Sequence, residues 1–111
     1  MLIAVAGPYT AATDEKMQSN LDAMNDACAE VYKKGHIPVV GVNNALPVLQ
    51  RLAPEERAGT MMKISLAIVD KCDAILMIGE SPGANQERAL FVKKRLPVYN
   101  SIDEIPENII Q

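Results

Sequence analysis

The sequence predicts an α/β fold: a three-layer sandwich around a small parallel sheet of four to five strands, of the Rossmann-like or flavodoxin-like kind. Two observations lead to this prediction. Short apolar runs alternate along the chain with longer segments of helical periodicity, and such alternation implies right-handed crossovers between parallel strands. The runs at 2–7 and 74–79 are apolar without interruption, as strands covered by helices on both faces need to be.

The first half of the chain is predicted to form a strand, a long helix and a second strand. The helix begins after Thr13, a good N-cap residue, and ends at Gly35, which suits the position just beyond a helix. Its apolar residues recur at spacings of four and three, as one stripe of an amphipathic helix: Met17, Leu21, Met24, Cys28 and Val31. The second strand covers 37–42, and Pro38 indicates an early position in the strand or an edge position in the sheet, because proline cannot donate to a neighbouring strand.

Two helices are expected in the middle of the chain. Residues 45–52 form a short helix that is broken by Pro54, and a longer helix runs from Glu55 to about Asp70. The inward face of the longer helix is predicted to carry six residues at helical spacing: Ala58, Met61, Met62, Ser65, Ile68 and Val69.

The last third of the chain is predicted to hold two strands and a helix. The apolar run at 74–79 is the clearest strand of the sequence. A helix begins with Ser81 as its N-cap, is followed by proline at its first position, and ends near Lys94. Residues 97–99 form a short final strand, and residues 102–106 form a closing turn or short helix.

Length and charge restrict the class of protein. With 111 residues the chain fits one domain, 1–111. The net charge of −3 argues against nucleic acid as a partner, because nucleic-acid binders neutralise phosphates with clustered basic residues. The basic cluster at 93–95 lies at a predicted helix end, where cations suit the helix dipole. The sequence contains no glycine-rich phosphate motif of kinases or dinucleotide enzymes, so no cofactor is expected.

Histidine and cysteine are scarce, so no metal site is expected. His36 is the only histidine of the sequence and is predicted to lie at the surface or at a helix C-cap. Cys28 and Cys72 match no metal or redox spacing and are expected to be reduced, largely buried thiols of a cytoplasmic protein. The apolar run at 1–7 lacks a basic leader and is too short to cross a bilayer, so neither a signal peptide nor a membrane span is predicted.

Two loops at the predicted carboxyl edge of the sheet carry unusual residues. In an open parallel sheet, ligands bind outside the carboxyl ends of the strands. Ser81 and Gly83 place the backbone amides of a helix start at this edge, which favours an anion such as a phosphate, although Ser-Pro also begins helices that bind nothing. The other loop supplies four candidate binding residues: Gly7, Pro8, Tyr9 and Thr10.

Glu87 is the candidate reactive group. It lies six residues after Ser81, about 9 Å along a helix, on the face that also carries Leu90, so it is predicted to point inward. The positive end of the helix is expected to keep the carboxylate ionised. Such a group facing a ligand crevice can attack the anomeric carbon of a sugar. The alternative is a structural glutamate paired with Arg88, Lys94 or a neighbouring subunit.

Other polar residues near this edge have more than one interpretation. The hydroxyl of Tyr9 could orient a ligand or the carboxylate, or the tyrosine ring could cap the core. Asn43 and Asn44, at the end of the second strand, could hydrogen-bond the edge of a base or form an Asx turn. Asn85, between Gly83 and the glutamate, is counted with the candidate ligand-binding residues.

Three segments share their motifs with one known family. They are Ile3-Ala4-Val5-Ala6-Gly7-Pro8-Tyr9, the stretch Leu66 to Met77 with Cys72-Asp73-Ala74, and Ser81-x-Gly83-x-x-x-Glu87 followed by Ala89 and Pro97-Val98. On these segments the chain resembles the nucleoside 2-deoxyribosyltransferase family and its nucleotide N-glycosidase relatives over most of its length. The third segment is the most specific, because family members carry their catalytic glutamate in that context.

The resemblance implies cleavage or exchange of the N-glycosidic bond of a (deoxy)nucleoside or nucleoside 5′-monophosphate. Glu87 would attack the anomeric carbon, Tyr9 would position the sugar or the carboxylate, and Ser81 would contact the phosphate. The family usually has an aspartate where this chain has Ser65. This serine is therefore a weakened stand-in for the acid that assists the leaving base, because a neutral hydroxyl does not replace an acid well.

Two other functions stay open at this point. One is a non-catalytic nucleotide-binding or sensor module, which the serine at position 65 favours. The other is a hydrolase of NAD-like dinucleotides, because related sheet architectures also place a glutamate near a nicotinamide riboside. A homo-oligomer, a dimer or larger, is expected as well, since the family often completes its site across a subunit interface. Asn100 and Ser101, just after the last strand, are candidates to reach across.

Overall fold

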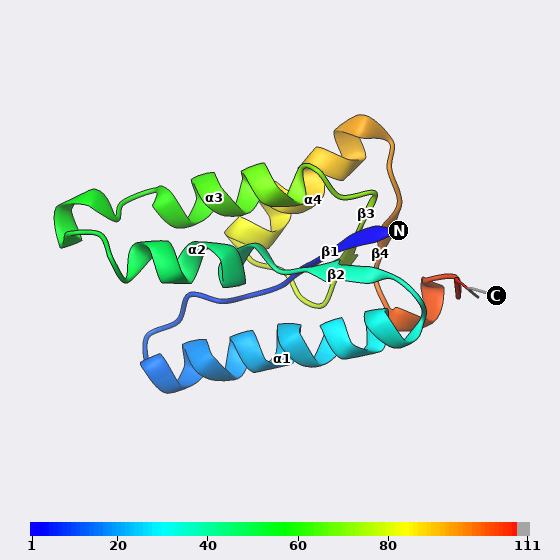
Figure 1. Cartoon of the computed structure of the whole chain (residues 1–111), viewed down its shortest axis with the longest axis horizontal. Coiled ribbons are helices and arrows are strands. Elements are labelled where there is room, and N and C mark those ends of the chain that lie inside the picture. Colours follow the sequence, from blue (N-terminus) through cyan, green and yellow to red (C-terminus); the bar gives the residue numbers. More distant parts are fainter. Residues whose placement is uncertain (109–111) are drawn as a thin grey trace.

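A four-stranded parallel sheet forms the centre of the computed structural model, which describes residues 1–108 (Figure 1). Its strands are β1 (Leu2–Ala6), β2 (Ile37–Val39), β3 (Ala74–Met77) and β4 (Val98–Tyr99), in the spatial order β2-β1-β3-β4. Every neighbouring pair is parallel. The predicted α/β fold class is confirmed, with four strands in the described part of the sheet.

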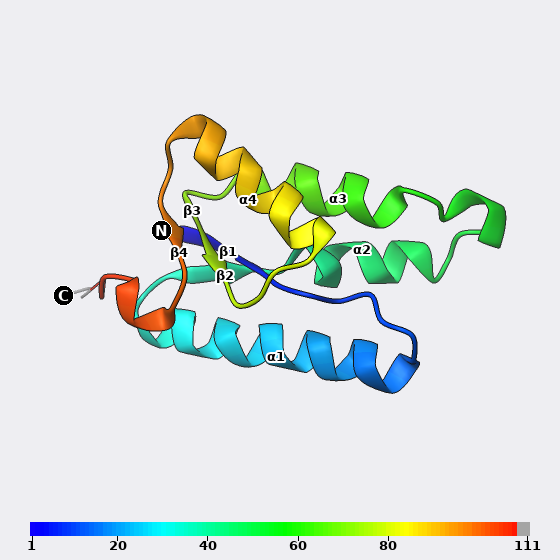
Figure 2. The ribbon, with the colours of Figure 1, turned by 180° about the vertical axis from the view of Figure 1, so that it is seen from behind.

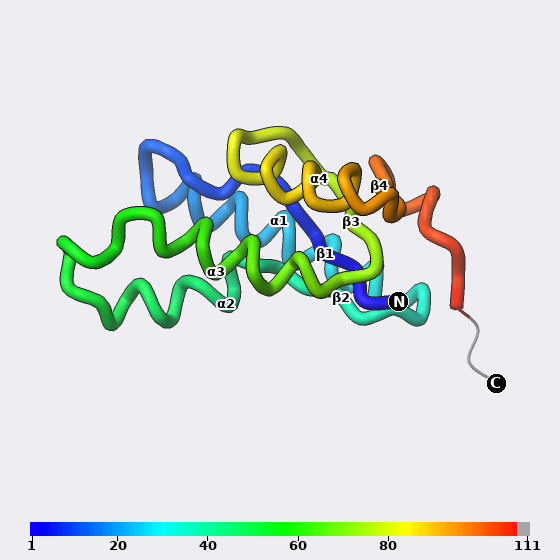
Figure 3. Tube along the Cα trace, turned by 90° about the horizontal axis from the view of Figure 1, so that it is seen from above, coloured from blue at the N-terminus to red at the C-terminus, as the bar shows by residue number. Residues whose placement is uncertain are grey.

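Helices cover both faces of the sheet and make the fold three-layered. Helix α1 (Asp14–Lys33) lies along one face, and α3 (Thr60–Val69) and α4 (Pro82–Lys94) lie on the other, as Figures 1 and 2 show. Helix α2 (Gly41–Leu49) lies beside α3. These two helices form a hairpin that extends beyond the carboxyl ends of the strands (Figure 3).

The two central strands supply the core on both sides. In β1, Ile3 and Val5 belong to the apolar cluster under α1, whereas Ala4 and Ala6 belong to the cluster under α3 and α4. All four residues of β3 are buried as well. This double burial is the reason that the predicted strands are apolar throughout rather than alternating.

Helix α1 follows the prediction closely. The Thr13 side chain accepts a hydrogen bond from the Lys16 amide at 3.1 Å, and Gly35 adopts a φ of 89° just beyond the helix. Three members of the apolar stripe are fully buried against the sheet: Leu21, Met24 and Val31. Local capping and one apolar face were therefore enough to place this helix.

The prediction for 37–42 was wrong at its end. β2 stops at Val39, and α2 begins at Gly41 rather than at 45. β2 is an edge strand paired only with β1 within residues 1–108, and this pairing ends at Ala4 and Val39. The chain then turns directly into α2, so that the two asparagines at 43–44 lie in the first turns of a helix rather than in an Asx turn.

The single helix predicted from Glu55 to Asp70 is divided in two. Residues Pro54–Glu56 form a 3-10 turn, and α3 begins only at Thr60. Gly59 separates them with a φ of 77°, a left-handed conformation that glycine adopts without strain and that interrupts a helix. The closing 3-10 turn at Ile102–Glu104 agrees with the turn or short helix predicted there.

His36 is buried, and its prediction as a surface or C-cap residue was wrong. The side chain is 4% exposed, and its Nε2 lies 2.6 Å from the Pro106 carbonyl oxygen. The Lys34 ammonium donates to the carbonyl oxygens of Ile102 and Ile105. The segment after β4 thus folds back over the end of α1 and covers the histidine.

Candidate functional site

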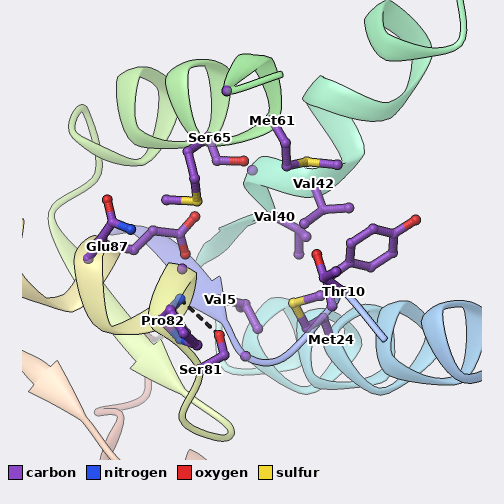
Figure 4. Close-up of a pocket in the computed structure, with 18 residues that line it drawn as sticks. Val5, Thr10, Met24, Val40, Val42, Met61, Ser65, Ser81, Pro82 and Glu87 are labelled. Atoms are coloured by element: carbon purple, nitrogen blue, oxygen red, sulfur yellow. Dashed lines mark hydrogen bonds between the residues drawn. The ribbon is translucent and has the colours of Figure 1, made fainter. Parts of the chain in front are cut away.

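A cavity of about 370 Å³ opens at the carboxyl edge of the sheet, where ligands bind in open parallel α/β folds (Figure 4). Its volume lies within the range of small-molecule sites, about 300–1,000 Å³. Val5 of β1 and Val40, just after β2, line it from the sheet, and α1, α3 and the starts of α2 and α4 contribute to its walls. The cavity lies where the sequence predicted a site.

Most of the predicted site residues meet in this cavity, although they are far apart in the sequence. Three come from the loop after β1, one from α3 and three from the beginning of α4. They are Gly7, Tyr9, Thr10, Ser65, Ser81, Gly83 and Glu87. The parallel sheet brings the loop and the helix starts together because its strands all end at the same edge.

Three predicted site residues do not line the cavity. Pro8 is half-buried next to it. Asn43 is exposed, and its side-chain amide donates to the Asn25 side chain at 2.8 Å. Asn85 is exposed on α4, where its side-chain oxygen accepts from Arg88 at 3.2 Å. Both asparagine side chains therefore form hydrogen bonds with a neighbouring helical side chain instead of facing a ligand in the cavity.

The candidate inter-subunit residues also lie outside the cavity. The backbone amides of Asn100 and Ser101 donate to the carboxylate of Glu104 and so fix the turn after β4. Their side chains remain exposed.

The sequence reasoning missed the apolar wall of the cavity. Met61 was assigned to the core-facing side of a helix, and Met62 with it, but both line the cavity and are only half-buried. Val40 and Val42, at the junction of β2 and α2, line it too. The available signal was the glycine between these valines, which follows a strand and begins a helix at the carboxyl edge.

The carboxyl group of Glu87 points into the cavity and has no protein partner among residues 1–108 (Figure 4). The residue is 7% exposed. Arg88, one expected partner, binds Glu80 at 3.3 Å, and Lys94, the other, binds Asp70. Neither of the structural pairings considered for the glutamate within its own chain is formed.

Burial raises the pKa of Glu87 from 4.5 to about 7. This corrects the expectation that the helix end keeps the carboxylate ionised, since near neutral pH the protonated form is populated as well. The residue lies in the second turn of α4, and the effect of a helix dipole falls off within the first turn. Loss of hydration therefore outweighs the helix end. A carboxyl group that titrates near pH 7 in a cavity is a frequent feature of catalytic sites.

The beginning of α4 offers donors to an anion. The Ser81 hydroxyl accepts a hydrogen bond from the Ala84 amide at 3.0 Å, and its own proton stays available for a ligand. Pro82 has no amide proton, and Gly83 follows with an amide in the first turn of the helix. A Cβ on Gly83 would lie 3.1 Å from the sulfur of Met62, so the two helices approach closely beside the cavity.

Ser65 lies deeper, on the wall formed by α3. It is 2% exposed, and its hydroxyl has no hydrogen-bond partner within residues 1–108. It lies directly against the first residue of α2, because a Cβ on Gly41 would lie 2.8 Å from its oxygen. Figure 4 shows the side chains of Ser65 and Glu87 on the same side of the cavity.

The described residues were also compared with what a metal site, a reactive thiol and a membrane-spanning helix require. Among the described residues no three His, Cys, Asp or Glu side chains gather where they could hold a metal ion. Burial raises the pKa of Cys28 and that of Cys72 to about 11, so both are protonated thiols. No helix in residues 1–108 has the length and apolarity that crossing a bilayer requires.

The sequence matches a known protein family. No curated protein matches this sequence. Residues 1–101, however, match the family described as "Domain of unknown function (DUF7768)". The match covers the whole sheet and every residue that lines the cavity, from Val5 to Glu87. The chain therefore belongs to the DUF7768 family.

Proposed function

We propose that the protein cleaves or exchanges the N-glycosidic bond of a (deoxy)nucleoside or a nucleoside 5′-monophosphate, with Glu87 as the nucleophile. One observation carries the proposal. A buried carboxyl group without a partner in residues 1–108 faces a cavity of small-molecule size. Burying an unpaired carboxyl group opposes folding, so such a group facing a cavity is a candidate for a functional role.

In the proposed reaction an oxygen of the Glu87 carboxylate attacks the anomeric carbon of the sugar. The carbon–oxygen bond forms as the carbon–nitrogen bond breaks, and the base leaves with the electron pair of that bond. Water or a second base then attacks the same carbon and releases the carboxylate. With a pKa of about 7, about half of the enzyme has the required ionised form at neutral pH.

The surroundings of the carboxylate support a nucleotide as the small-molecule partner. The Ser81 hydroxyl and the Gly83 amide at the start of α4 suit a 5′-phosphate. Tyr9 and Thr10 border the same cavity from the loop after β1 and suit the sugar. The sequence resemblance to nucleoside 2-deoxyribosyltransferases supports the same reaction and a homo-oligomer. The two free thiols support a cytoplasmic location.

A base-release assay tests the proposal. Purified wild type, Glu87→Gln and the control Glu80→Gln are incubated with ribo- and deoxyribonucleosides and their 5′-monophosphates, with and without a second free base. Glu80 is exposed in the loop before α4 and does not line the cavity. Chromatography is expected to show base release by wild type and Glu80→Gln and a loss of at least about 1,000-fold in Glu87→Gln. Full turnover by Glu87→Gln would refute the nucleophile.

A non-catalytic nucleotide-binding or sensor module is the second candidate. It is favoured by the serine at position 65, where the family that the sequence resembles carries an acid. The same samples separate the two candidates. A nucleotide that raises the melting temperature of the wild type without any base release over long incubation supports the binding module.

A further inference from the structure

The cavity contains a second polar region that the proposed attack by Glu87 does not use. It consists of the Ser65 hydroxyl and the first backbone amides of α2, at Gly41 and Val42. All three residues line the cavity. We refer to this group of donors as the carbonyl subsite.

The Ser65 hydroxyl is the first indication of a ligand. It is buried at 2% exposure and lacks a hydrogen-bond partner within the described chain. Leaving a buried hydroxyl unsatisfied destabilises the folded state, and most buried polar groups in folded proteins do have partners. A hydroxyl that lines a cavity can find its partner in the bound molecule.

The beginning of α2 is the second indication. The N-cap residue is Val40, whose side chain cannot accept a hydrogen bond, and no side-chain cap is formed. The Asn43 amide donates to the Val40 carbonyl oxygen at 3.1 Å. The amides of Gly41 and Val42 have no partner inside the helix and carry its partial positive charge. Gly41 permits the contact with α3, because a Cβ there would lie 2.7 Å from the Cβ of Ser65. The hydroxyl and the first residue of α2 are thus direct neighbours.

We propose that the carbonyl subsite binds an exocyclic carbonyl oxygen of the leaving base, so that the substrates are nucleosides or nucleotides of oxo-bases. Backbone amides can only donate hydrogen bonds, so they match a carbonyl oxygen and not an exocyclic amino group. The positive end of α2 favours negative charge at the same place. The thioethers of Met61 and Met62 provide a polarizable wall for a flat ring.

The subsite also has a role in the reaction, which rests on the proposed function. When the bond between the anomeric carbon and the base breaks, its electron pair passes to the ring nitrogen. In an oxo-base this charge is delocalised onto the conjugated carbonyl oxygen. The amides of Gly41 and Val42 and the Ser65 hydroxyl stabilise the charge there, as preorganised donors do at other developing oxyanions. The released base anion takes up a proton from water.

A matched pair of substrates tests the inference. Deoxyinosine 5′-monophosphate and deoxyadenosine 5′-monophosphate differ only along one edge of the base. The first has a carbonyl oxygen next to a ring N–H, and the second has an amino group next to a ring nitrogen without a proton. Wild type is expected to release hypoxanthine with a kcat/KM at least about 10-fold above that for adenine. Ser65→Ala is expected to lower hypoxanthine release by about 10- to 100-fold and to bring the ratio toward one. Ser19→Ala, on the exposed face of α1, is the control and keeps the wild-type ratio.

Binding gives a second measurement that does not depend on turnover. The melting temperature of Glu87→Gln is measured with each of the two nucleotides. Deoxyinosine 5′-monophosphate is expected to raise it more than deoxyadenosine 5′-monophosphate does. Adding Ser65→Ala to Glu87→Gln is expected to remove this difference. Glu87-dependent release at equal rates for both bases would overturn the subsite and leave the proposed function standing. Absence of any base release would refute the proposed function. The melting temperatures would then test the subsite alone, and equal shifts with the two nucleotides, or no shift with either, would overturn it.

Discussion

At the scale of single residues, the buried carboxyl group of Glu87 links stability to pH. Its pKa rises from 4.5 to about 7 on burial, so the folded state holds the proton more tightly than the unfolded state. The stabilisation by the bound proton is complete below the unfolded pKa and is lost as the pH rises through the folded pKa. At about 1.4 kcal/mol per pH unit, the loss between pH 4.5 and pH 7 is about 3 kcal/mol.

The first prediction follows from this linkage. Glu87→Gln replaces the carboxylate by a neutral group of the same shape, so it is expected to raise the free energy of unfolding by up to about 3 kcal/mol at pH 8. At pH 4 both side chains are neutral and the difference is expected to be small. Urea denaturation at the two pH values measures the effect. Glu80→Gln, at an exposed position, is the control and does not show this pH dependence. An equal gain at both pH values would contradict the argument.

The pH profile of the reaction is a second prediction at this scale. A nucleophile acts in its ionised form, so kcat/KM is expected to rise with pH and to level off above the pKa of Glu87 at about 7. Below that pH the rate is expected to fall about 10-fold per unit. Initial rates of base release between pH 5 and pH 9 give the profile. A profile that falls through pH 7 instead would assign Glu87 the role of an acid.

At the scale of the elements, the contact between α2 and α3 decides the shape of the cavity. Gly41, the first residue of α2, lies so close to Ser65 that an added Cβ would meet both its side chain and its backbone at 2.7–2.8 Å. Gly83, in the first turn of α4, faces the flexible end of Met62 at 3.1 Å instead. Both glycines lie at the start of a helix, but a side chain added at Gly41 would meet rigid backbone, whereas one added at Gly83 would meet a flexible side chain.

A pair of alanine variants measures this difference. Gly41→Ala is expected to lower the free energy of unfolding by about 1–3 kcal/mol, because the backbone of α3 has to move. Gly83→Ala is expected to be neutral or to stabilise by up to about 1 kcal/mol, because alanine favours the helix and the methionine can shift. Chemical denaturation of both variants provides the comparison. A loss in Gly83→Ala as large as in Gly41→Ala would show that the contacts with Met62 are as rigid as those with Ser65.

At the scale of the whole molecule, the cavity lies between parts of the chain that are remote in sequence. The loop after β1, the α2–α3 hairpin and the start of α4 meet where the parallel strands end (Figure 3). The hairpin reaches past the sheet and gives the described chain its long dimension of 48 Å. Its methionines form one wall of the cavity. The site is therefore a product of the parallel topology rather than of any local motif.

The predictions were right where the structure depends on residues close in sequence and wrong where it depends on residues far apart in sequence. The boundaries of α1 and α4 were predictable because capping residues and one apolar stripe act within a few positions. The end of β2 was not, because it depends on where the pairing with β1 stops. His36 was misplaced for the same reason, since a segment about 70 positions away in the sequence covers it.

By itself the sequence determined the α/β class, the helices α1 and α4 and the inward direction of Glu87, because periodicity and capping are local properties. Only the tertiary structure decided that Ser65 contacts Gly41, that Asn43 and Asn85 bond to helical side chains instead of lining the cavity, and that burial raises the pKa of Glu87 to about 7. Desolvation and hydrogen-bond satisfaction depend on every neighbour in space, and the packing of the whole chain determines those neighbours.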